Sequence, residues 1–462
     1  MYPVSEAYID AINARTRTTR MSGVITLSNS TTVNISDADI VQGSLYIIRK
    51  SVSGNVFDVG SVVASEMGLS LLNYGGTAYA LSGASIALSW GIAVPSSATW
   101  ADFEAAYSSW DVAESLFADW NAIEMAASSY EDIPLGVWRV DDAKRKQRIV
   151  AVKAYDGMMQ LDKDLVGVAK TGTPYVLVAS LCARCGVTLG TTSAQIVALP
   201  NGTMTVTVPD KSSIETCRDL LMWIAQLTGT FGCIDRAGAL ALRPHGQASS
   251  RSIGKTERIS ADVSDDTVLV TRLAMVVGGV AYIRSAVMWD GLEATYNSWD
   301  ELEGIYQSWE AIENNAYQGM QLEENPLLTG KTETEINAVL SNLLGAMRRV
   351  SYHPASIEYI NDPALDCGDI VTLADTGAPS GLDAPILITG GTWRYRGKHT
   401  LSAADKPSFD EGALPVKPQN EKRINSIYSG GGGGGTKIHI SSSPPDESLM
   451  ADGDVWLQYM EV

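Results

Sequence analysis

The pair Cys182-Ala-Arg-Cys185 has a spacing at which two thiolates can hold a metal ion. A structural zinc site also needs a second pair or histidines close by, and the neighbouring sequence supplies neither. We therefore predict no metal site and interpret the two thiols as packed on one helix. The chain has five cysteines and shows no secretory signal, so we expect reduced thiols and synthesis in the cytosol.

Other patterns that could support catalysis are incomplete. Histidines occur at four scattered positions, His245, His353, His399 and His439, without metalloprotease spacing, and no Gly-x-Ser-x-Gly motif is present. The glycine block Gly430 to Gly435 is followed by Thr436-Lys437, the reverse of the Lys-Thr order of a phosphate-binding loop. We therefore predict no catalytic residues, no cofactor and no enzymatic activity.

Two cassettes each carry three tryptophans spaced ten residues apart: Trp100, Trp110, Trp120, Trp289, Trp299 and Trp309. In the leading units an aromatic residue follows seven positions later, at Tyr107, Phe117, Tyr296 and Tyr306. An offset of seven keeps both rings on one helix face, so each unit predicts a short helix. Ten residues rotate a continuous helix by about 1000°, and the apolar face would slip by about 80° per unit, so turns should separate the units.

The cassettes allow two interpretations. In the first, the tryptophans together with Tyr107, Tyr296 and Tyr306 form an exposed surface that binds a glycan or a protein. In the second, they pack on one another, either as an addition to the fold without a binding role or as a contact between subunits. Periodic aromatic residues more often belong to a core, which favours the second interpretation.

Composition limits the class of partner. The net charge of −19 and the pI near 4.6 argue against specific nucleic-acid binding, which depends on Lys and Arg displacing counterions. The same charge suits the wall of a conduit that repels passing DNA. No apolar run is long enough for a membrane span.

The flanking sequence predicts mainly strands. A short helix is expected within residues 5–20, then a hairpin of residues 23–27 and 31–35, further strand character at 44–48 and 60–63, and a strand pair at 136–140 and 148–152 with the charged residues 141–146 between them. Strand patterns return between residues 260 and 372, with a helix near 333–350 and a hairpin strand at 390–397.

Residues 175–243 differ in pattern. Residues 175–185 are predicted to be helical with Gly186 as C-cap, and residues 203–208 to form a strand. A capping box of Ser212 and Glu215 opens a helix through Leu227, and residues 231–242 form a hairpin. This part therefore predicts a small α/β domain.

Four stretches together resemble the hub family of phage-type tail tips, which comprises baseplate hub proteins of contractile tails and the N-terminal hub region of tail-associated proteins of long-tailed phages. They are Val4 to Ile12 with residues 23–25 and 36–40; Ile133-Pro134-Leu135-Gly136 with residues 151–163; Arg218 to Gln226 running into Cys233-Ile234-Asp235-Arg236-Ala237-Gly238; and Asp362-Pro363 with Cys367-Gly368-Asp369-Ile370 and residues 393–397. They lie within residues 1–410 and imply a fold, not an activity.

The resemblance implies an α+β, predominantly β fold with two tube-like β domains, an inserted small α/β domain and two helical Trp-repeat loop insertions. The predicted divisions are residues 1–174 with the insertion at 98–128, the α/β hub domain at 175–250, the second β domain at 251–410 with the insertion at 287–316, a Gly-rich linker at 411–440 and a C-terminal strand element at 441–462.

Function is expected to follow from the resemblance. It implies a homotrimeric structural protein of the virion tail tip, made in the host cytoplasm, which joins the tail tube to tip or fibre proteins and lines the path of ejected DNA. One alternative is a receptor- or glycan-binding tail protein that uses the tryptophans. Another is a hydrolase whose site the sequence does not reveal.

Overall fold

The computed structural model describes residues 1–72, 81–94, 112, 129–210, 213–285, 318–360, 362–375, 383–407, 438–441 and 455–458. Within these residues the protein is predominantly β with few helices, as the sequence predicts. Residues 430–435 and both tryptophan cassettes lie outside them, apart from Val112. None of the helices in the described part combines the length and apolar character that a membrane crossing requires.

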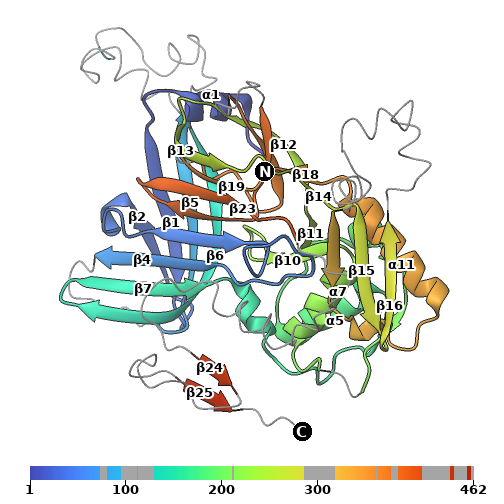
Figure 1. The fold of residues 1–462 in the computed structure, drawn as a ribbon. Helices are drawn as coiled ribbons and strands as arrows, with labels where there is room; N and C mark the ends of the chain where they lie inside the picture. Colours follow the sequence, from blue (N-terminus) through green and yellow to red (C-terminus); the bar gives the residue numbers. More distant parts are fainter. Residues whose placement is uncertain are drawn as a thin grey trace, which may run out of the picture.

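A sheet of eleven strands makes up one side of the molecule (Figure 1). In spatial order its strands are β13 (Arg258–Val263), β19 (Ala355–Ile360), β23 (Lys398–Ala403), β22 (Gly390–Arg394), β3 (Tyr46–Lys50), β4 (Glu66–Leu72), β7 (Ile149–Tyr155), β6 (Ser129–Lys146), β5 (Ser85–Val94), β1 (Thr19–Thr26) and β2 (Thr32–Ser36). Neighbouring strands are antiparallel throughout.

The early and late β segments of the chain share this sheet. Strand β22 pairs with β3, and Trp393 lies opposite Ile47 in their register. Backbone hydrogen bonds therefore join residues from the two predicted β domains directly, which the predicted division of the chain did not anticipate.

Helix α1 (Glu6–Asn13) covers one side of β5. The Ser5 hydroxyl caps it by accepting a hydrogen bond from the Tyr8 backbone N–H, and the Tyr8 ring meets Trp90 edge to face at 6.3 Å between centroids. The helix ends at Asn13 because residues 15–20 offer no apolar face, and β1 begins at Thr19. The expectation of a helix within residues 5–20 is thus right only for its first half.

Both predicted strand pairs are present, but the strands of the second pair are longer than predicted. The first hairpin is formed by β1 and β2, and the second by β6 and β7. Residues 141–146, expected between the strands of the second hairpin, lie inside β6, and all of them except Asp141, which sits at a register shift, pair with β7. The chain reverses instead at Gln147, which has a positive φ of 56°.

The α/β segment contains most of its predicted elements. These are β8 (Thr171–Gly172), α5 (Pro174–Cys185), α6 (Ser193–Val197), β9 (Val206–Thr207), α7 (Cys217–Leu227), β10 (Thr230–Ile234) and β11 (Leu240–Pro244). Gly186 ends α5 in the left-handed conformation, and β10 pairs with β11 as expected. The strand predicted at 203–208 shortens to Val206–Thr207.

The start of α7 differs from the prediction. Its capping box is Thr216 with Asp219, and the helix begins at Cys217. Residue 212, predicted to cap it, lies outside the described residues. Both pairs fit the same four-residue signature, so the sequence alone could not distinguish them.

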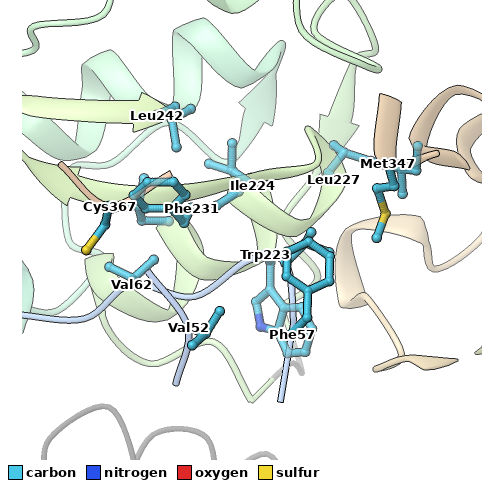
Figure 2. Packing of buried hydrophobic residues seen from close by; sticks show 14 of the residues in the cluster. Val52, Phe57, Val62, Trp223, Ile224, Leu227, Phe231, Leu242, Met347 and Cys367 are labelled. Carbon is cyan, nitrogen blue, oxygen red and sulfur yellow. The ribbon is translucent and has the colours of Figure 1, made fainter. Parts of the chain in front are cut away.

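A hydrophobic core joins the α/β segment to residues from the early chain (Figure 2). Val52, Phe57 and Val62 lie between β3 and β4 in the sequence and pack with Trp223 and Phe231. Residues 60–63, expected as a strand, form only an isolated bridge from Val62 to Gly232, because their side chains fill this core instead of extending a sheet.

The remaining elements form smaller units. They are β12 (Gln247–Ile253), β20 (Asp369–Leu373) and β21 (Ala384–Leu387) in one sheet; β14 (Val268–Leu269) with β18 (Ser351–Tyr352); β16 (Val280–Ser285), β15 (Arg272–Val277) and β17 (Gly319–Leu322) with helix α11 (Glu333–Met347); the short helices η1 (Asp37–Asp39), η3 (Gly157–Leu161) and η4 (Pro326–Leu328); and the parallel pair β24 (Ile438–Ser441) and β25 (Val455–Gln458).

The capping box of α7 provides a test of the fold. Thr216→Ala removes the acceptor for the Asp219 backbone N–H and should lower the free energy of unfolding by about 1 kcal/mol. Thr216→Ser keeps a capping hydroxyl and should match the wild type. Urea denaturation followed by circular dichroism measures both, and equal stability of all three proteins would contradict this helix start.

Candidate functional site: a buried ionic junction

All nine predicted interaction residues lie outside the described residues: Trp100, Trp110, Trp120, Trp289, Trp299, Trp309, Tyr107, Tyr296 and Tyr306. Their role therefore stays a prediction. The described residues bring together a different group, centred on the segment 362–369.

This segment carries three carboxylates, at Asp362, Asp366 and Asp369. The side chains of Asp362 and Asp369 are fully buried, and that of Asp366 is 15% exposed. A buried carboxylate is costly unless it is paired with a cation and hydrogen bonded. Each of the three forms an ion pair with an arginine: Asp362 with Arg251, Asp366 with Arg236 and Asp369 with Arg243.

Asp366 is the centre of the network. Arg236 binds it through two bonds, Nη2 to Oδ1 at 2.8 Å and Nε to Oδ2 at 3.2 Å, the two-pronged geometry that suits a guanidinium and a carboxylate. Arg49 and Arg243 lie 3.5 and 3.6 Å away. Burial alone raises the pKa of Asp366, but the charges of these arginines outweigh it and hold the pKa well below its ordinary value.

A tight turn between β10 and β11 positions Arg236. The Asp235 carboxylate accepts hydrogen bonds from the backbone N–H groups of Ala237 and Ala239, and Gly238 adopts a positive φ of 86°. A Cβ atom on Gly238 would lie 3.2 Å from Val137 Cβ, so the glycine also lets the turn approach β6 closely. The turn formed by Asp235-Arg236-Ala237-Gly238 therefore places the Arg236 guanidinium next to β6 of the large sheet.

A bulge in β6 provides acceptors for the arginines. The β5–β6 register shifts at Leu88 and Ser89, so that Leu135 lies between Pro134 and Gly136 without a partner residue. The Pro134 carbonyl accepts a hydrogen bond from Arg236, and the Leu135 carbonyl accepts one from Arg49. The bulge explains why a proline is tolerated inside this strand.

Arg236 also donates to the carbonyls of Pro363 and Leu365, so this one side chain joins the β10–β11 turn to two other segments of the chain. Gly368, in the same loop, has a φ of 91°, and a Cβ there would lie 2.9 Å from the Phe231 ring. Only glycine fits this position without displacing the ring or straining the backbone.

Asp362 joins helix α1 to the late chain. Its carboxylate accepts a hydrogen bond from the Tyr8 hydroxyl at 2.8 Å and pairs with Arg251 Nε at 3.1 Å. Arg251 in turn pairs with Glu257 and donates to the Asn13 side chain. Burial, followed by the nearby negative charge of Asp362, raises the pKa of Tyr8 far above its ordinary value.

The opening of α7 is joined to the segment that follows β7. Arg218, with 6% of its side chain exposed, pairs with Asp162 at 3.0 Å, and the Cys217 backbone N–H donates to the Lys163 carbonyl. Asp156 accepts hydrogen bonds from the backbone N–H groups of Ser65 and Met158. The first two contacts join α7 to residues 162–163, and the bonds of Asp156 fix the start of this segment beside Ser65, the residue before β4.

The contacts bring together residues from all four stretches on which the sequence resemblance rests. Tyr8 belongs to the first, Pro134 and Leu135 to the second, Arg236 to the third and Asp362 to the fourth. Sequence reasoning identified the stretches but not the junction. In so acidic a chain the aspartates resemble a solvated face, and only the placement of three of them next to Pro363 and Gly368 hints at a buried loop.

The arrangement is suited to fixing chain segments relative to one another. The lowered pKa of Asp366 keeps its carboxylate ionised, and Arg49 and Arg236 donate to backbone carbonyls of the β6 bulge. Beside it lies a cavity of about 30 Å³, lined by Arg49, Trp393 and His399 among others, which is large enough for one water molecule.

Histidines and cysteines in the described residues are largely structural. Burial lowers the pKa of His245 to about 3, and burial together with repulsion from Arg49 lowers the pKa of His399 to about 3. Cys182 and Cys185 are both buried on α5, which confirms the interpretation of helix-packed thiols. Across the described ranges, no three His, Cys, Asp or Glu side chains gather in a way that could hold a metal ion.

Comparisons with known proteins identify no family for the chain. No family model matches the sequence, and no curated protein matches it. Among solved structures, one similar chain is the 43 kDa tail protein of prophage MuSo2 from Shewanella oneidensis, with 10% identity, a TM-score of 0.42, and coverage of 83% of this chain and 97% of the other.

A second similar chain belongs to the virion of a native gene transfer agent particle. It has 8% identity and a TM-score of 0.19, and the match covers 36% of this chain and 51% of the other. At these scores neither similarity carries an assignment of fold or function.

The junction predicts a large effect of a single substitution. Arg236→Met leaves the Asp366 carboxylate without its two-pronged partner and should lower the free energy of unfolding by about 3 kcal/mol. Lys398→Met breaks a partly exposed pair with Glu358 and should cost less than about 1 kcal/mol. Urea denaturation compares the two, and similar small losses would show that the junction is not critical.

The two buried histidines predict acid sensitivity. Because their pKa values are about 3 in the folded protein, the unfolded chain binds protons first as the pH falls below about 6.5. As the pH falls from about 6 to 4.5, each of these histidines should reduce the free energy of unfolding by about 1.4 kcal/mol per pH unit. This range lies above the pH at which protonation of Asp366 affects stability. Denaturation of wild type and His245→Gln/His399→Gln should give a shallower slope for the variant; equal slopes would refute this.

Proposed function

We propose that this chain is a structural protein of a phage virion, a subunit of the tail-tip or baseplate hub. Three copies form a homotrimer that joins the tail tube to tip or fibre proteins and lines the path of ejected DNA. In this role the chain acts without a catalytic centre or a cofactor, binds no nucleic acid specifically, and is located at the tail tip.

The observation that carries the proposal is the convergence at the ionic junction. The four stretches that resemble the hub family are dispersed over more than 350 residues, yet they supply Tyr8, Pro134, Arg236 and Asp362 to one connected network. Patterns that matched by chance would have no reason to meet in space. The contact among the four stretches supports the interpretation that they resemble the hub family because they build the same part of a common fold.

Two further features fit this role. The early and late β segments share one antiparallel sheet through β3 and β22, which gives the subunit a continuous curved frame on which a ring could be built (Figure 1). The net charge of −19 suits a wall along which DNA passes without being retained.

Receptor or glycan binding is the second candidate, because six of the eleven tryptophans lie in the two cassettes. Glycan-array binding that is lost in Trp110→Ala and Trp299→Ala would favour this function. Binding that is absent from the wild type, or unchanged in both variants, would remove it.

The trimer is tested by mass in solution. Sedimentation equilibrium of the purified chain should give about three times the chain mass of 49.3 kDa. The measurement should be made over a wide concentration range and at low and high salt. A mass of one chain under every condition would contradict the homotrimer.

A further inference from the structure

The hairpin of β6 and β7 extends beyond the neighbouring strand. The pairing of β5 with β6 ends at Ser85 opposite Arg139, and one further bond joins the Val140 N–H to the Ala84 carbonyl. Within the described residues, Asp142 to Lys146 of β6 pair only with β7, and Asp141 lies at a register shift between the two strands. On its other side β7 is covered by β4 as far as Ile149. Residues 141–149, here called the arm, therefore present one open strand edge (Figure 1).

The arm is strongly basic in an acidic chain. Its end carries four cations within five residues: Lys144, Arg145, Lys146 and Arg148. All four are exposed, and of these Lys144 pairs with Asp142 at 2.9 Å. Ile149, 39% exposed, adds an apolar contact beside them. An open edge with this charge is suited to an acidic strand.

One strand edge with acidic residues beside it exists in the same chain. β13 is the last strand of the large sheet, and it pairs only with β19 within the described residues. β13 has six residues, the same number as residues 141–146 of β6, which extend beyond β5, and its Ile259 is 54% exposed. Asp262 on β13 and Asp265 and Asp266 just after it are exposed. Asp266 pairs with Lys406 at 3.2 Å, and Arg258 at the start of β13 is bound to the carbonyls of Ala374 and Asp375. The opposite end strand, β2, contains no charged residue.

We propose that the arm of one copy adds to the β13 edge of a second copy. Six strands separate β6 from β13 in the sheet order, so the two edges are at different places on the subunit and pair between chains. Such a head-to-tail contact uses two different surfaces and closes into a ring when the rotation allows it. The inference rests on the homotrimer in the proposed function and identifies its interface.

The basic residues of the arm could instead protect its edge or bind DNA, and each of these roles leads to a different result. Lysines on an exposed edge can protect a strand from aggregation, in which case their reversal produces aggregates instead of monomers. A cluster of cations can also bind the phosphates of DNA, in which case reversal changes DNA binding and leaves association unchanged.

The test reverses the charges of the arm. Lys144→Glu/Arg145→Glu/Lys146→Glu/Arg148→Glu should weaken self-association at least tenfold in sedimentation equilibrium at low salt. The matched control, Arg20→Glu/Lys170→Glu/Arg184→Glu/Lys331→Glu, makes the same change of charge at residues outside both edges and should associate like the wild type. Circular dichroism verifies that each protein is folded.

A charge exchange makes the test specific. Asp262→Lys/Asp265→Lys/Asp266→Lys alone should also weaken association, and combining it with the reversed arm in one chain should restore the trimer. An arm variant that associates like the wild type, aggregates, or loses only DNA binding overturns the arm proposal while the hub function stands. A wild type that is monomeric under every condition overturns the homotrimer itself.

Discussion

The ion pair between Arg236 and Asp366 is the interaction on which the arrangement of the chain depends. Its partners come from the α/β segment and from the loop after β19, and Arg236 also bonds to the β6 bulge in the large sheet. Removing Arg236 leaves Asp366 with only the longer contacts to Arg49 and Arg243, and removing Asp366 leaves the Arg236 charge facing backbone carbonyls alone, and either change costs far more than the intact pair contributes. Any arrangement of these segments that separates Arg236 from Asp366 is therefore disfavoured, and the pair selects one way of joining the sheet to the α/β segment.

The rest of the fold follows from this join. The segment between β3 and β4 leaves the sheet, fills the core of the α/β segment with Val52, Phe57 and Val62, and returns. The late chain then completes the sheet by placing β22 beside β3. In the described residues, a chain whose early and late halves are paired in this way has β13 and β2 as the end strands of its large sheet, and the basic arm extends beyond β5.

Sequence reasoning succeeded where the signal was local. The β1–β2 and β10–β11 hairpins, the C-cap at Gly186 and the helix near residue 333 all follow from turn chemistry and periodicity within a few residues. It failed where distant segments decide the outcome. Residues 60–63 have strand propensity but pack on α7 and β10, and Arg236 resembles an ordinary turn residue until the β6 bulge and Asp366 are placed beside it. The tryptophan cassettes stay a prediction.

The proposed hub function requires three copies of this chain to form a ring at the junction of tail tube and tip. An electron cryo-microscopy reconstruction of the assembled particle is the decisive measurement. We expect three copies around the tail axis at the distal end of the tube, with the large sheet of each copy in the ring wall. Density for this chain only in peripheral fibres, or no density for it in the particle, would contradict the hub role.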